Sequence, residues 1–113
     1  MKIIHKNETK IFKNSDKCIA IEYPMGDKDI NGAVIELSGR YPEKGRVVNL
    51  ECKELAYILE GSGKLVIEGK EVSFNEGDLF LLEPGEKYYW EGEFKMFAPC
   101  VPAWWPEQHK EVE

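Results

Sequence analysis

The stretch EGSGKLVIEGKEVSFNEGDLFLLEPGEKYYWEG, residues 60–92, decides the fold class of this chain. Five glycines divide it at intervals of 8, 8, 8 and 7 residues: Gly61, Gly69, Gly77, Gly85 and Gly92. Glycine readily adopts the positive φ that tight turns require. Short apolar or alternating runs of strand length lie between these glycines. The spacing therefore predicts a succession of antiparallel hairpins.

The rest of the chain continues this pattern, and no window has a convincing helical period. We expect strands over residues 10–13, 18–23, 33–37, 46–50, 55–59, 65–67, 72–74, 79–82, 88–90 and 94–97. A short helical turn is expected at 106–109, because Pro106 suits a first helical position. Many short strands joined by glycine turns indicate an all-β sandwich or barrel with little or no helix.

Length and charge exclude several classes of protein. The 113 residues fit one domain, and the net charge of −6 disfavours nucleic acid and anionic membranes as partners. No apolar run approaches the roughly 18 residues of a membrane span. The three cysteines are odd in number and widely spaced, which predicts reduced thiols and a cytoplasmic location.

Two segments resemble the motifs of the cupin superfamily. Glu54 and Gly61 match the Glu-x6-Gly that ends the first motif, and the stretch from Gly77 to Gly85 is similar to the start of the second motif. In the second segment Glu83 takes the slot of the motif's proline. The resemblance covers roughly residues 30–105. It implies a double-stranded β-helix, or jelly-roll barrel, with a pocket inside it.

The same resemblance implies a divalent metal, but most of its ligand positions are replaced. The two histidine slots of the first motif fall at Val48 and Leu50, or at Val47 and Asn49 with a longer spacer. Tyr88 takes the third histidine slot. Only Glu54 remains of the four ligands, whereas a metal site needs three or four donors. We therefore predict no cofactor, and any divalent metal would bind at Glu54.

Six residues are the candidates for a site in the barrel. Glu54 and Tyr88 are the candidate catalytic pair, because a carboxyl in apolar surroundings gains a raised pKa and a nearby phenol can donate a proton. The candidate ligand-binding residues are Asn49, Cys52, Glu54, Tyr88, Trp90 and Trp104. Cys52 is included because it lies two residues before Glu54, and such residues share a strand face when no bulge intervenes.

Residue parity around Glu54 predicts a strand that is covered on both faces. Glu54, Ala56 and Ile58 alternate with Leu55, Tyr57 and Leu59. One face would line the barrel, and the other would meet a second layer or a partner chain, which favours a homodimer. We divide the domain 1–113 into N-terminal strands (1–28), a barrel core (29–101) and a tail rich in Pro and Trp (102–113).

Three hypotheses for function follow. The first is a binding protein that holds a small polar molecule, such as a sugar or sugar derivative, without a typical metal site. The second is an enzyme: an isomerase or epimerase that uses Glu54 and Tyr88, or an oxygenase-type enzyme with a degenerate metal site. The third is a structural or regulatory dimer that uses the tryptophan tail for contacts. Fold alone does not separate them.

Overall fold

The computed structural model describes residues 1–113 as one curled antiparallel sheet with two short 3-10 turns. The elements in chain order are η1 (Lys6–Glu8), β1 (Lys10–Lys13), β2 (Cys18–Tyr23), β3 (Asn31–Tyr41), β4 (Arg46–Asn49), β5 (Lys53–Ile67), β6 (Lys70–Asn75), β7 (Leu79–Leu82), β8 (Lys87–Val101), η2 (Pro106–Gln108) and β9 (His109–Val112). This is an all-β jelly-roll fold, as the glycine spacing and the cupin resemblance predicted. Neither 3-10 turn has the length or apolar character of a membrane-spanning helix.

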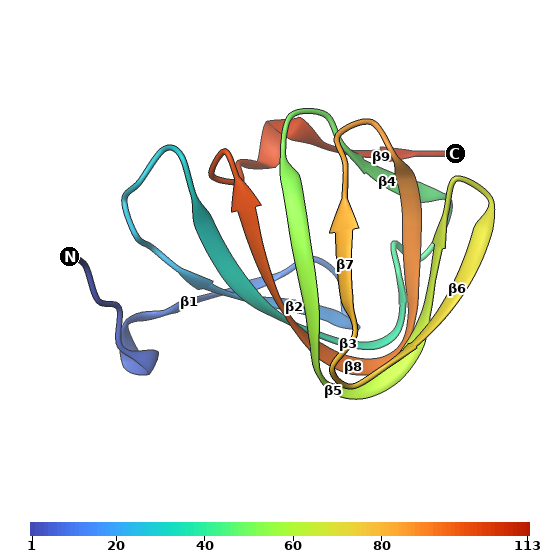
Figure 1. Ribbon diagram of the computed structural model, residues 1–113, viewed down its shortest axis with the longest axis horizontal. Coiled ribbons are helices and arrows are strands. Elements are labelled where there is room, and N and C mark those ends of the chain that lie inside the picture. The colour runs from blue at the N-terminus through green and yellow to red at the C-terminus, as the bar shows by residue number, and fades with distance from the viewer.

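The sheet follows the path β1-β2-β3-β8-β4-β9, and β5 pairs with β6, β7 and β8. Strands β3, β5 and β8 are long and curve together beneath the barrel interior (Figure 1). The N-terminal segment with β1 lies at one side of the barrel in this view. The long strands therefore supply both the floor and the walls of the interior.

Two of the five glycines that we assigned to turns lie inside strands instead. Gly61 is in β5 and Gly92 is in β8, and the two strands pair across this region. A Cβ at Gly61 would meet the Glu93 carbonyl oxygen, and one at Gly92 would meet the Ser62 carbonyl oxygen. Both residues also have positive φ, +83° and +147°. Their absent side chains let two strongly bent strands approach closely, so each pair of predicted short strands is one continuous strand.

The other three glycines of the series lie in turns, as predicted. Gly69, Gly77 and Gly85 have φ of +79°, +89° and +88°, with open space where a Cβ would be. They need glycine for backbone conformation rather than for close packing. The predicted strands over 10–13, 18–23 and 79–82 are confirmed with the same bounds. Strand β9 was not predicted.

The inner and outer faces of β5 differ in how much of their side-chain surface is exposed. Ala56 and Ile58 are fully buried on the inner face, whereas Leu55, Tyr57 and Leu59 keep 40–43% of their surface exposed. No second layer of this chain covers the outer face, so of the two predicted covers only the partner chain remains, and it stays a prediction. A register shift between Ile58 and Glu60 marks a bulge where β5 begins to bend.

Candidate functional site

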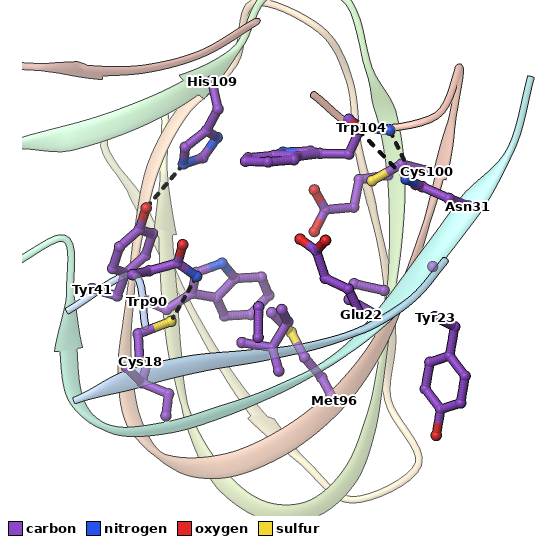
Figure 2. Close-up of a pocket in the computed structure, with 18 of the residues that line it drawn as sticks. Cys18, Glu22, Tyr23, Asn31, Tyr41, Trp90, Met96, Cys100, Trp104 and His109 are labelled. Carbon is purple, nitrogen blue, oxygen red and sulfur yellow. Dashed lines mark hydrogen bonds between the residues drawn. The ribbon is translucent and has the colours of Figure 1, made fainter. Parts of the chain in front are cut away.

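A cavity of about 180 Å³ opens in the barrel interior, lined mainly by inner-face residues of β2, β3 and β8 and by the C-terminal tail. Trp90, Phe94 and Met96 line its apolar part, and Tyr41, Glu54, Tyr88, Trp104 and His109 supply aromatic and polar groups. In Figure 2, Trp104 lies beside His109, across the cavity from Trp90 and Met96. An apolar cavity of roughly 150 Å³ holds benzene, so this one can hold a six-membered ring.

Glu54 is the central ionisable group of this cavity. It lies on the inner face of β5, where its side chain is 9% exposed. Burial raises its pKa to about 7, and hydrogen bonds from Asn49 and the Cys100 thiol offset part of that rise. At neutral pH the carboxyl can therefore both give and take a proton.

Behind Glu54, a fixed network of hydrogen bonds sets the orientation of each polar side chain. The Oε1 atom of Gln108 accepts the backbone N–H groups of Glu51 and Cys52, at 3.2 and 3.1 Å. Its Nε2 consequently donates to Oδ1 of Asn49 at 3.1 Å. The amide nitrogen of Asn49 then faces Glu54 Oε1 at 3.1 Å and the Tyr88 hydroxyl at 3.5 Å. Backbone amides thus determine, through Gln108, which end of Asn49 meets the carboxyl.

The same argument fixes the tautomer of His109. Oδ1 of Asn49 only accepts, so the His109 Nδ1 atom, 2.8 Å away, carries the proton and donates it. Burial lowers the pKa of His109 to about 4, so the ring is neutral at pH 7. Its Nε2 is then an acceptor, and the Tyr41 hydroxyl donates to it at 3.1 Å. The lone pairs of the Tyr41 oxygen remain on the cavity side as acceptors.

The structure brings four of the six candidate residues to the cavity wall: Glu54, Tyr88, Trp90 and Trp104. Asn49 is buried behind the wall and acts through its hydrogen bonds to Glu54 and Tyr88. Cys52 does not line the cavity. It is buried just before β5, and its thiol donates to the Pro102 carbonyl at 3.3 Å.

The structure also decides between the two motif alignments left open by the sequence. Val47 pairs with Tyr88 in the β4–β8 ladder, and both side chains are buried. Asn49 lies two residues further on the same buried face, whereas Leu50 is 49% exposed. The longer spacer therefore describes the geometry, and Val47 and Asn49 take the inward positions.

The cavity residues that the sequence reasoning missed include four with side chains able to form hydrogen bonds: Glu22, Tyr41, Cys100 and His109. Glu22 carried a signal, because it follows Cys18 and Ala20 on the inner face of β2 and is a charged residue at an apolar position. The sequence around His109 carried no such signal. Its place depends on the pairing of β9 with β4, which sets His109 opposite Asn49.

The residues around Glu54 do not fit a bound divalent metal. Its hydrogen-bond partners are the amide nitrogen of Asn49 and the thiol of Cys100, and the Tyr88 hydroxyl shares that Asn49 amide with it. Burial raises the pKa of Tyr88 and of Cys100 well above the usual values, so both keep their protons. No three His, Cys, Asp or Glu side chains of the chain converge as metal ligands. A metal needs several deprotonated donors, and this set supplies one.

Comparisons with known proteins agree with this architecture. A family model described as an EutQ-like cupin domain matches residues 42–97. No curated protein matches. The chain belongs to the cupin superfamily.

Among solved structures, the nucleoside dehydratase Pac13 of Streptomyces is similar over 100% of this chain and 92% of its own, with a TM-score of 0.89 and 16% identity. The polyketide cyclase RemF of Streptomyces resistomycificus covers 100% of this chain and 86% of its own, with a TM-score of 0.76 and 17% identity. Ectoine synthase of P. lautus covers 100% and 91%, with a TM-score of 0.75 and 15% identity. At these identities the likeness shows the fold.

Proposed function

We propose that this protein binds a small polar molecule, a sugar or sugar derivative, in the barrel cavity without a metal. The observation that carries the proposal is the buried Glu54 carboxyl in a cavity with aromatic walls. Sugar hydroxyls both donate and accept, so they can donate to Glu54 and to the Tyr41 oxygen and accept from Tyr88. The C–H faces of a sugar ring suit the indole of Trp104.

The solved neighbours support this class of ligand. Variants of the Streptomyces dehydratase were solved with uridine, which contains a ribose. That protein has the same fold over the whole of this chain, which supports a sugar derivative as the class of ligand proposed here.

The test is a thermal-shift and calorimetric titration with uridine, ribose and glucose. A ligand at 100 times its Kd stabilises the native state by about 2.7 kcal/mol, which raises Tm by several degrees. Glu54→Gln should weaken binding at least tenfold, and Glu60→Gln, an exposed change on the same strand, should leave it unchanged. The proposal fails if millimolar concentrations of all three compounds leave Tm unchanged.

A second candidate is a metal-independent isomerase or epimerase, which the pKa of about 7 at Glu54 favours. Glu54 would remove a proton from the carbon beside a carbonyl, and Tyr88, whose raised pKa keeps its hydroxyl protonated, would donate to the carbonyl oxygen. Incubation of aldoses and ketoses in D2O should then introduce deuterium at that carbon, as seen by NMR. Glu54→Gln should slow exchange by about 10²–10⁴-fold. Exchange at the wild-type rate in that variant would exclude Glu54 as the base.

We also propose a homodimer formed through the outer face of β7, β5 and β8. Leu55 and Tyr57 of β5 lie opposite Leu81 and Leu79 of β7, and Tyr57 lies opposite Phe97 of β8. Each keeps at least 40% of its surface exposed, so the five form one apolar patch. Sedimentation should give a dimer, and Leu81→Lys should give a folded monomer. A wild-type monomer at high micromolar concentration would contradict this.

The three cysteines support a reducing compartment, which we propose to be the cytoplasm. Cys18, Cys52 and Cys100 are all buried and free. Thiols in this state are typical of proteins kept in reducing surroundings.

A further inference from the structure

The charges on the cavity wall are of one sign. Among the 24 residues of the lining, the acidic ones are Glu22, Asp27 and Glu54, and no Lys or Arg is present. The one histidine, His109, is neutral because burial lowers its pKa to about 4. The protein therefore supplies no cation inside this cavity.

The negative charge of Asp27 is already balanced by groups of the protein near the mouth of the cavity. Its carboxylate accepts the backbone N–H groups of Asp29 and Ile30, at 2.8 and 3.2 Å. Lys2 and Lys28 lie close enough to act on its charge. The acidic character of the interior therefore comes from Glu22 and Glu54.

Glu22 and Glu54 reach the interior from two different strands. Glu22 projects from β2 into the cavity, on the same side as Cys100 and below Trp104 (Figure 2). Glu54 lies opposite Cys100 in the β5–β8 ladder. Burial raises the pKa of both carboxyls. The nearest base to Glu22 is Lys10, its exposed partner on β1, which lies outside the lining.

A pair of carboxyls in a partly desolvated cavity, with no Lys or Arg in the lining, discriminates between ligands by charge. An anionic ligand would bring further negative charge beside these carboxyls where screening is weak, which is unfavourable. A cationic ammonium group would donate charge-assisted hydrogen bonds to both carboxylates. The indole rings of Trp90 and Trp104 add faces that attract cations.

We propose that the natural ligand is a cationic sugar derivative, an amino sugar, whose ammonium group binds between Glu22 and Glu54 while its ring lies against Trp104. This inference rests on the proposed function, because it names the class of sugar derivative that the cavity selects. It assigns Glu22 as the residue that determines specificity.

Three sugars that differ only at C6 test the proposal by calorimetry at pH 7: 6-amino-6-deoxyglucose, glucose and glucuronate. The primary amine is fully protonated at this pH. We expect the amino sugar to bind at least tenfold more tightly than glucose, and glucuronate at least tenfold more weakly. Glu22→Gln should abolish most of the preference for the amino sugar over glucose. Glu76→Gln, the same charge change in an exposed turn, should leave that preference and the binding of glucose unchanged.

Proton release gives an independent readout. An ammonium beside Glu54 lowers the pKa of that carboxyl from about 7, so binding of the amino sugar at pH 7 should release a fraction of a proton. Binding of glucose should release a much smaller fraction of a proton. Titrations in two buffers of different ionisation enthalpy measure the difference.

The outcomes separate the two proposals. Glucose and the amino sugar binding within twofold of each other, or glucuronate binding best, would overturn the cationic ligand while the sugar-binding function stands. A charge preference that survives Glu22→Gln would remove Glu22 from the proposal. If none of the three sugars binds, and uridine and ribose do not bind either, both the sugar-binding function and the cationic ligand are overturned.

Discussion

Two groups of side chains occupy the barrel interior, and they are built in opposite ways. The aromatic cluster of Phe74, Phe80, Trp90 and Phe94 has ring centroids 4.8–5.6 Å apart, and four of its five contacts are edge to face, the fifth being tilted at 46°. The polar network of Tyr41, Asn49, Glu54, Tyr88, Gln108 and His109 is joined by hydrogen bonds, and no buried polar side-chain atom of the chain lacks a partner. Trp90 is shared, because it also packs against Tyr88 and lines the cavity.

The difference distinguishes interior residues that hold the fold from those that we propose to serve a ligand. The aromatic cluster stabilises the barrel through burial and ring geometry alone. The polar network includes a carboxyl whose burial is costly, and an apolar core of the same volume would avoid that cost. Such a network is therefore evidence for function rather than for stability.

The largest expected effect is a loss of stability when a residue of the aromatic cluster is substituted. Phe74 is 2% exposed and contacts the other three rings, so Phe74→Ala should leave a cavity and lower the free energy of unfolding by about 3–5 kcal/mol. Urea denaturation measures the change. Phe12→Ala, at an exposed position of β1, should cost less than about 1 kcal/mol. A loss below about 1 kcal/mol for Phe74→Ala would show that the rings are not the main support.

The second expected effect is a pH dependence of stability, which the polar network causes and the aromatic cluster does not. The pKa of Glu54 in the folded state, about 7, lies above its ordinary value of 4.5. Its contribution to stability is therefore fully present below pH 4.5 and lost as the pH rises through 7. At about 1.4 kcal/mol per pKa unit, the loss approaches about 3 kcal/mol.

Glu54→Gln removes this titration. The difference in unfolding free energy between wild type and variant should change by about 3 kcal/mol between pH 4.5 and 8, in favour of the variant at high pH. His109, whose lowered pKa acts in the opposite direction below pH 6.5, is present in both proteins and cancels. Glu60→Gln serves as the control. A pH-independent difference for Glu54→Gln would mean that the carboxyl is solvated in solution.

The smallest effect concerns the attachment of Trp104 over the cavity. The side chain of Asn31 accepts the Trp104 backbone N–H at 3.0 Å and donates to the Trp104 carbonyl at 3.5 Å. Asn31→Ala should lower global stability by only about 1 kcal/mol but increase hydrogen exchange at the Trp104 amide. Asn7→Ala, in the exposed turn η1, should change neither. Unaltered exchange in Asn31→Ala would show that Trp104 is held by packing alone.

Local sequence patterns predicted much of the fold because hairpin chemistry is local. Gly69, Gly77 and Gly85 lie in turns with positive φ, and the apolar run 79–82 is strand β7. The same rule failed at Gly61 and Gly92. There the glycine is required by the neighbouring strand's backbone, and a sequence window contains no information about that neighbour.

The candidate site was predictable where a motif position, strand parity or the composition of the tail singles out a residue. Glu54, Tyr88 and Trp90 were found from strand parity and motif position, and the structure brings all three to one cavity. Glu22 was visible as a charge at an apolar position of β2 but was not weighed. Cys52 is buried on the same side as Glu54, as parity predicted, but its thiol donates to the Pro102 carbonyl and it does not line the cavity.

The sequence by itself determined the all-β class, most strand positions, the cupin resemblance and the loss of the metal-ligand set, since each depends on residue type and short-range spacing. The tertiary structure alone decided that Gln108 orients Asn49, that Asn49 sets the tautomer of His109, and that Glu22 shares a cavity with Glu54. These pairs are separated by 32 to 60 residues along the chain. Strand register and barrel closure bring them together, and both depend on the whole sheet.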